Sequence, residues 1–225
     1  MAMNSFSKLG EITVLFVGTD LLTEGAIPES FCMIASRQYR TIHLEQKCAK
    51  DYRLIDHLKE LNRPEWLEAC RSADLVIVQE LGGAVGEDTM RAIEGIRALL
   101  TPDTPIYSLI TELDYPKKLE ATDNHYYIYG GYAHHLLVGG GILSYEQLHK
   151  ADTPLPNKLY GYLVACVMYG TLFSVDCEMF SDDFLPPEEI PGESDRLKRE
   201  TMRRIKRAAG MACEFSREHA MMLNV

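Results

Sequence analysis

The sequence predicts a three-layer α/β/α sandwich built around a central parallel sheet. Two apolar runs rich in β-branched residues, 12–18 and 75–79, are typical of strands that are covered on both faces. Helical spacing follows each run, at 27–37 after the first and at 87–100 after the second. Strands that alternate with helices in this way indicate crossover connections with helices on both faces of the sheet.

The other elements follow from the same patterns. Further strands are predicted at 41–44 and 105–110, and helices at 54–61, 66–73, 157–173 and 195–222. Residues 125–132 and 136–142 are predicted as short strands, although the glycines at 130–131 and 139–141 are equally compatible with loops. Four tyrosines at 126, 127, 129 and 132 either line a sugar or acyl pocket or fill the sheet edge.

Composition divides the chain into a domain at 11–175, a loop at 176–194 and a C-terminal amphipathic helix at 195–225. The loop holds seven acidic and no basic residues and three prolines. The helix holds eight basic and four acidic residues, so its arginines are interpreted as a solvated face or as partners of the acidic loop. Its apolar stripe, together with three methionines, suggests a homo-oligomer contact. The stripe is Leu197, Ile205, Ala208, Ala212 and Phe215, and the methionines are Met211, Met221 and Met222.

The net charge of −10 argues against a nucleic-acid partner and against docking on an anionic membrane. No apolar run reaches the roughly 20 residues that cross a bilayer, and the N-terminus lacks a secretion signal, so a cytoplasmic protein is expected. The six cysteines form no C-x-x-C pair, which favours buried thiols over a zinc site. We expect a small-molecule ligand and no cofactor.

Ligands of open parallel sheets bind beyond the carboxyl ends of the strands. The residues that follow the predicted strands therefore form the candidate site, with Asp20 as its nucleophile or general base. Asp20 is alternatively a capping or loop carboxylate. A Mg²⁺ or Ca²⁺ site of Asp20, Glu80, Glu112 and Asp114 is a weaker alternative, because no spacing motif supports it. The candidate ligand-binding residues are Gly18, Thr19, Gln79, Glu80, Gly82 and Glu112.

Three segments resemble the SGNH (GDSL-type) hydrolases, and most closely an uncharacterised SGNH-like group. They are F-V-G-T-D-L-L at 16–22, V-I-V-Q-E at 76–80 and D-T-P-L-P-N-K-L-Y-G-Y-L-V-A-C-V-M-Y-G-T-L at 152–172. The group has I-G-N-S-F, L-Q-E and D-G-x-H-P-S-x-x-G-x-Y-L-A-A-C-x-x-Y-A-T-L in these places. The resemblance spans roughly residues 11–173 and implies an SGNH-hydrolase or flavodoxin-like sandwich.

The same resemblance implies a degenerate catalytic triad. The nucleophilic serine of the family falls on Asp20 and its histidine on Leu155, whereas the aspartate that orients the histidine is matched by Asp152. Aspartate has no hydroxyl and leucine accepts no proton, so the esterase reaction of the family is expected to be absent. His149, three residues before Asp152, is the candidate replacement base. His134 and His135 are expected to point in opposite directions on a strand.

Three functions remain open at this point. The chain is a divergent member that binds or acts on a small acyl, ester or carbohydrate-type ligand in the former cleft. Alternatively, it is a hydrolase with a site rebuilt around Asp20, or a non-catalytic assembly protein that uses its C-terminal helix.

Overall fold

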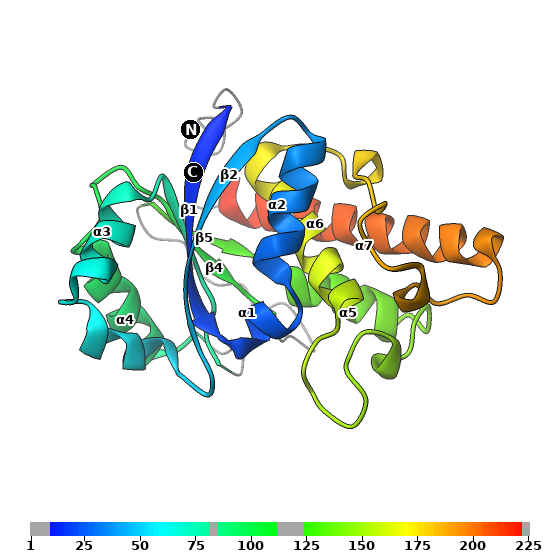
Figure 1. Ribbon diagram of the computed structural model, residues 1–225, viewed down its shortest axis with the longest axis horizontal. Coiled ribbons are helices and arrows are strands. Elements are labelled where there is room, and N and C mark those ends of the chain that lie inside the picture. The colour runs from blue at the N-terminus through cyan, green and yellow to red at the C-terminus, as the bar shows by residue number, and fades with distance from the viewer. Residues whose placement is uncertain (1–9, 82–84, 112–123, 222–225) are drawn as a thin grey trace.

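The centre of the protein is a five-stranded parallel sheet with the strand order β2-β1-β3-β4-β5. The computed structural model describes residues 10–81, 85–111 and 124–221. Figure 1 shows the sheet edge-on between two groups of helices. The strands are β1 (Glu11–Thr19), β2 (Thr41–Ala49), β3 (Leu75–Val78), β4 (Ile106–Leu109) and β5 (His125–Ile128).

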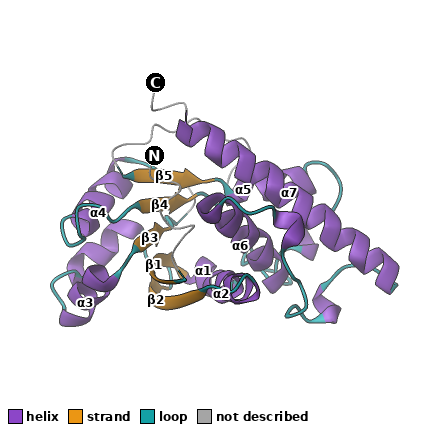
Figure 2. Cartoon of the chain, turned by 90° about the horizontal axis from the view of Figure 1, so that it is seen from above, coloured by secondary structure: helices purple, strands orange, loops and turns teal. Residues whose placement is uncertain are grey.

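Each face of the sheet has its own hydrophobic core, because successive strand residues point in opposite directions. Val14 and Phe16 face α2 (Ile27–Arg37), α5 (Gly130–Val138), α6 (Lys158–Phe173) and α7 (Asp195–Met221). Leu15 and Val17 face η3 (Leu54–Glu60), α3 (Pro64–Ser72) and α4 (Glu87–Arg97). Figures 1 and 2 show the two helical layers on opposite sides of the sheet. The predicted three-layer sandwich is therefore confirmed.

Within the described part of the chain there are four more short helices, and one of them begins at the carboxyl end of the sheet. Helix α1 starts directly after β1, whereas three 3₁₀ helices lie in the loops around α6. Their bounds are α1 (Asp20–Glu24), η4 (Tyr145–Gln147), η5 (Cys177–Met179) and η6 (Pro187–Glu189).

Helix α6 is the central helix of the larger layer, and its residues from Leu159 to Phe173 are buried. Asn157 caps it by accepting a hydrogen bond from the amide of Tyr160 at 3.0 Å. A Cβ atom at Gly161 would lie 1.7 Å from the carbonyl oxygen of Gly25. Glycine at 161 therefore lets α6 press against the turn between α1 and α2.

Helix α5 corrects the prediction of a strand at 136–142, and β5 ends at 128 rather than 132. The segment from 130 to 138 is almost wholly apolar, and such runs have no periodicity that separates a buried helix from a buried strand. His134 and His135 consequently lie on a helix. Two smaller corrections concern β2, which extends to Ala49, and residues 54–60, which form a 3₁₀ helix.

The apolar stripe of α7 is buried within its own chain. Ile205, Ala208 and Ala212 belong to the core that α6 and α5 share. Phe215 contacts the rings of Tyr129 and Tyr132, whereas Leu197 is exposed. A contact between copies through α7 would therefore have to use other residues of the helix.

The acidic segment 176–194 is tied to the rest of the fold by three ion pairs. Asp182 pairs with Lys206 on α7 at 3.3 Å, Asp183 with Arg37 at 3.2 Å, and Glu189 with Lys158 at 3.6 Å. All six cysteines are free thiols. Four of them are buried, as predicted, whereas Cys32 and Cys48 are only partly buried. Among the described residues, no helix has both the length and the apolarity needed to cross a bilayer.

Candidate functional site

The turn between β1 and α1 is held together by Thr19 and Gln79, which are both fully buried. The Oε1 atom of Gln79 accepts hydrogen bonds from the amide of Thr19 at 3.2 Å and from its hydroxyl at 2.9 Å. The same hydroxyl accepts from the amide of Leu21 at 3.1 Å and so caps α1. The hydroxyl group nearest to the end of β1 is thus engaged within the protein.

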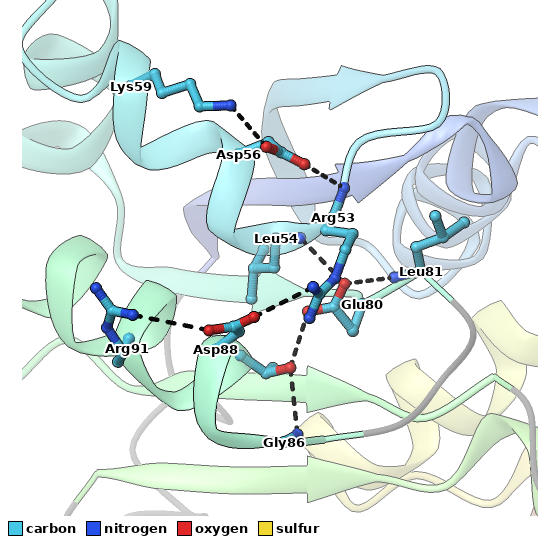
Figure 3. A network of polar contacts seen from close by, with 10 residues as sticks. Arg53, Leu54, Asp56, Lys59, Glu80, Leu81, Gly86, Asp88 and Arg91 are labelled. Carbon is cyan, nitrogen blue, oxygen red and sulfur yellow. Dashed lines mark hydrogen bonds and ion pairs between the residues drawn. The ribbon is translucent and has the colours of Figure 1, made fainter.

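Glu80 joins the end of β3 to two elements of the smaller helical layer (Figure 3). Its Oε1 atom accepts from the amides of Leu54 at 3.1 Å and Leu81 at 2.9 Å, and its Oε2 atom accepts from the hydroxyl of Thr89 at 2.8 Å. Only 6% of the residue is exposed. Both carboxylate oxygens therefore have partners inside the fold.

Gly18 is required where it stands, because a Cβ atom there would lie 2.8 Å from Leu22 Cδ1 and 3.0 Å from the carbonyl oxygen of Gln79. Its own carbonyl oxygen lies 3.0 Å from Nε2 of His57 on η3. A carbonyl only accepts, so this nitrogen donates. Burial lowers the pKa of His57, which keeps the ring neutral near pH 7. The sequence carried no signal for this contact, since the residues are far apart along the chain.

Asp20 is the first residue of α1 and is only partly buried. Its backbone carbonyl accepts from the hydroxyl of Thr23 at 3.1 Å. Its side chain makes no hydrogen bond or ion pair with any residue that the structure describes. The capping role that was the alternative for Asp20 is filled by Thr19, and the carboxylate is left available beside the helix N-terminus.

Asp152 lies in the loop between η4 and α6, where it is exposed and has a left-handed φ of 59°. The loop is closed by an antiparallel bridge between His149 and Pro156 and by a 2.8 Å hydrogen bond from the amide of Lys150 to the carbonyl oxygen of Leu155. Within residues 10–81, 85–111 and 124–221, no hydrogen bond or ion pair links Asp20, Asp152 and His149 to one another. The structure therefore does not assemble these three residues as a hydrogen-bonded triad.

His149 instead belongs to a cluster of four rings with His134, Tyr145 and Tyr160. It stacks on Tyr145 with centroids 3.7 Å apart, and its Nδ1 atom donates to the carbonyl oxygen of Tyr145 at 2.9 Å. His134 on α5 lies 5.3 Å from His149 and 5.6 Å from Tyr160, measured between centroids. The hydroxyl of Tyr160 donates to the carbonyl oxygen of Thr111 at 2.9 Å, which places the cluster near the carboxyl end of β4.

Both histidines of this cluster are neutral near pH 7. Burial, with the neighbouring His149 and His135 as smaller causes, lowers the pKa of His134 to about 4, and burial also lowers the pKa of His149. Since Nδ1 of His149 donates, its Nε2 atom is the acceptor of the neutral ring. His134 was missed as a neighbour of His149 because its segment was predicted to be a strand.

A different serine and histidine do form a contact, between β4 and β5. Ser108 Oγ and His125 Nε2 lie 2.9 Å apart, and both residues are almost fully buried. Burial, with Arg97 as a second cause, lowers the pKa of His125 to about 4. Both side chains come from neighbouring strands of the sheet, and none of the predicted site residues belongs to this pair.

An open pocket of about 530 Å³, lined mostly by charged and amide residues, lies beside the loop that holds Asp152. Its walls come from the last residue of α1, from η4 and the loop after it, from the start of α6 and from η6. None of the predicted site residues lines it, because its walls come from segments that only the fold brings together. The lining residues are Glu24, Glu146, Gln147, Lys150, Asn157, Lys158, Glu188, Glu189 and Pro191.

Two predicted residues, Gly82 and Glu112, lie outside the described residues, as does Asp114 of the alternative metal site. Among the residues that are described, no cluster of three or more His, Cys, Asp or Glu side chains is arranged to hold a metal ion.

Solved structures show the same fold at low sequence identity. A DUF4886 family protein from Bacteroides uniformis aligns with a TM-score of 0.64 and 13% identity, covering 90% of this chain and 94% of its own. The lipase Lip_vut3 from a goat rumen metagenome aligns with a TM-score of 0.54 and 11% identity, covering 68% of this chain and 94% of its own. A protein assigned as a GDSL-like lipase from Parabacteroides merdae aligns with a TM-score of 0.49, at 10% identity over 72% and 95% of the two chains.

No protein-family model matches the chain, and no curated protein matches it in sequence. The chain therefore shares the α/β fold of the first two structures, and its chemistry has to be argued from its own residues.

Proposed function

We propose that this protein binds a small, hydroxyl-rich ligand of the carbohydrate type and has lost the serine-esterase reaction of the SGNH hydrolases. The observation that carries the proposal is the 530 Å³ cavity, whose size is within the range of small-molecule sites. It is bounded by α1 and by the loop at 149–157, the two segments onto which the triad of the family maps.

The loss of esterase chemistry is supported by the turn after β1. Asp20 occupies the position of the nucleophile, and the neighbouring hydroxyl of Thr19 is buried and donates to Gln79. A hydroxyl nucleophile needs an imidazole that takes its proton. The histidine position holds Leu155, and the hydrogen bond of His149 in the described structure goes to Tyr145.

The chemistry of the cavity walls supports the ligand class. Carboxylates, ammonium groups and amides supply both acceptors and donors, and the one apolar residue of the lining is Pro191. Two ion pairs, Lys150–Glu24 and Lys158–Glu189, hold opposite charges at the rim and the wall. These donors and acceptors can form hydrogen bonds with the vicinal hydroxyls of a saccharide.

Calorimetric titration with a panel of mono- and disaccharides and short acyl compounds tests the proposal. We expect saturable binding of at least one saccharide and a loss of about tenfold or more in affinity for Lys158→Met and Glu188→Gln, by analogy with a lost charged hydrogen bond. Glu65→Gln on α3, on the other side of the sheet, is the matched control and should bind as the wild type does. No saccharide binding at millimolar concentration, or equal binding by Lys158→Met, would reject this function.

A hydrolase rebuilt around Asp20 is the second candidate. Its support is the carboxylate of Asp20, which has no side-chain partner among the described residues, and the acceptor nitrogen of His149. Turnover of short-chain nitrophenyl esters that is abolished by Asp20→Asn and by His149→Asn would favour it. Turnover that survives both substitutions would place the chemistry elsewhere, and no turnover would leave the binding function.

A further inference from the structure

The outward side of α7 carries a charge pattern that the folded chain does not use. We define the outer face of α7 as the exposed or partly exposed positions that recur every three or four residues along the helix. Figure 2 shows α7 on the outside of the larger helical layer. The outer face consists of Arg199, Arg203, Arg207, Gly210, Met211, Glu214 and Glu218.

The charges on the outer face have no ion-pair partner among the described residues, unlike other charged groups of the same helix. Lys206 pairs with Asp182, Arg204 pairs with Glu200, and Lys198 donates to the carbonyl oxygen of Pro187 at 2.7 Å. Lys206 and Lys198 thus secure the acidic segment, and Arg204 supports its own helix. The arginines of the outer face take no part in these contacts.

The order of these charges destabilises the isolated helix. Cations are unfavourable toward the N-terminus of a helix and anions toward its C-terminus, yet the outer face has its arginines first and its glutamates last. Arg203 also lies four residues from both Arg199 and Arg207, a spacing at which like charges repel. The repulsion among Arg199, Arg203 and Arg207 is unrelieved within the described chain and indicates a role outside the helix.

The middle of the outer face is small and apolar. Gly210 lies within the continuous helix where a Cβ atom would meet no atom within 4 Å, so packing within this chain does not require glycine. Beside it, Met211 is 46% exposed. Glycine in a helix interior costs stability relative to alanine, and methionine is enriched at protein interfaces. A close crossing with a second helix would explain both residues, because a glycine lets two helices approach and an exposed methionine gives apolar contact.

We propose that the outer face of α7 is a homodimer interface in which two copies of α7 pair in antiparallel orientation. In one antiparallel register, facing residues of the two helices have numbers that add up to 417. This register sets Arg203 against Glu214 of the second copy and Arg199 against its Glu218. Two-fold symmetry repeats both pairs, and Arg207 then lies opposite Gly210 near the crossing point. A parallel pairing would instead set Arg203 against Arg203, where the charges repel.

Antiparallel pairing also removes the cost described above. Each glutamate near the C-terminus of one helix meets arginines near the N-terminus of the other, and the two helix dipoles oppose each other. The interface uses the side of α7 that faces away from its own core, so no buried residue has to be uncovered. It is independent of the cavity and of any ligand.

Sedimentation velocity between 5 and 200 µM tests the interface through reversal of charge. The wild-type chain of 25.5 kDa should shift toward twice that mass as its concentration rises. Arg203→Glu alone and Glu214→Arg alone should each weaken self-association at least tenfold. The double variant R203E/E214R should restore it, and a mixture of the two single variants should form a heterodimer.

Arg71→Glu on the exposed side of α3 is the control of equal charge change and should dimerise as the wild type does. Circular dichroism of each variant checks that it is folded. A wild type that stays monomeric up to 200 µM overturns the proposal. A dimer that Arg203→Glu leaves intact also overturns the proposal. So does a dimer that Arg203→Glu breaks, if Glu214→Arg alone does not weaken it and the double variant R203E/E214R does not restore it.

Discussion

The side chain of Gln79 accepts two hydrogen bonds from Thr19, at 3.2 Å from its amide and at 2.9 Å from its hydroxyl. This relationship connects the carboxyl ends of β1 and β3 and keeps the hydroxyl beside Asp20 hydrogen-bonded within the protein. It makes Gln79 a structural residue of the site, and its removal should be felt as a loss of stability.

Gln79→Ala should lower the free energy of unfolding by about 2–4 kcal/mol, because both donors of Thr19 would be left buried without an acceptor. Urea denaturation measures the change. Thr23→Ala is the control, since its hydroxyl bonds to the backbone of Asp20 at an exposed position, and it should cost less than about 1 kcal/mol. Equal effects of the two variants would contradict the structural role of Gln79.

Gly161→Ala should prevent stable folding or lower stability by at least about 3 kcal/mol, because the new Cβ atom would lie 1.7 Å from the carbonyl oxygen of Gly25. The matched variant Gly210→Ala adds the same methyl group to open space in another helix. It should raise stability by about 0.5–1 kcal/mol. Thermal unfolding below 1 µM, where self-association is weak, compares the two. A Gly161→Ala variant as stable as Gly210→Ala would show that α6 and the α1–α2 turn are not in contact.

Stability should fall as the pH is lowered from about 6.5 to about 4. His125 is 2% exposed, and burial lowers its pKa from 6.5 to about 4 in the folded state. Between these values the unfolded chain binds the proton and the folded chain does not, so acid favours unfolding by up to roughly 3 kcal/mol for this residue.

His125→Gln should reduce that dependence without abolishing it, because burial also lowers the pKa of His134 to about 4. His43→Gln, which changes an exposed histidine on β2, should leave it unchanged. Urea denaturation at pH 4.5 and 7.0 gives the difference for each variant. A His125→Gln variant with the slope of the wild type would mean that the buried imidazole does not set this response.

All six thiols should react slowly with Ellman's reagent at pH 8 in the folded protein. Cys32 and Cys48 are the least buried, yet burial raises their pKa to about 11 and about 12, which leaves almost no thiolate. In denaturant all six should react at once. A thiol that reacts within seconds in the native protein would contradict the described burial.

The strands that are covered on both faces could be predicted from sequence because their apolar residues are continuous, as in β1 and β3. The second half of β2 could not, since this edge strand has three consecutive polar residues, Glu45, Gln46 and Lys47, in place of an apolar or alternating pattern. Helix α5 was predicted as a strand because an apolar run between glycines satisfies both geometries.

Only part of the candidate site could likewise be predicted from the sequence. Residues next to strand ends, such as Asp20 and Gln79, could be located from the chain alone, but the role of Gln79 depends on a neighbour 60 residues away. The contact of His57 with Gly18 and the walls of the cavity join distant segments through tertiary packing. No local pattern of residues encodes such contacts.

The three hydrogen bonds of Glu80 have a consequence for local opening. Its carboxylate is the shared acceptor for Leu54 on η3, Leu81 after β3 and Thr89 on α4, so none of these segments can separate without breaking a bond to the same side chain. The amide protons of Leu54 and Leu81 should therefore exchange with solvent deuterium in one common event, at one rate, although 27 residues separate them in the chain. One glutamate makes this corner of the protein a single unit of hydrogen exchange.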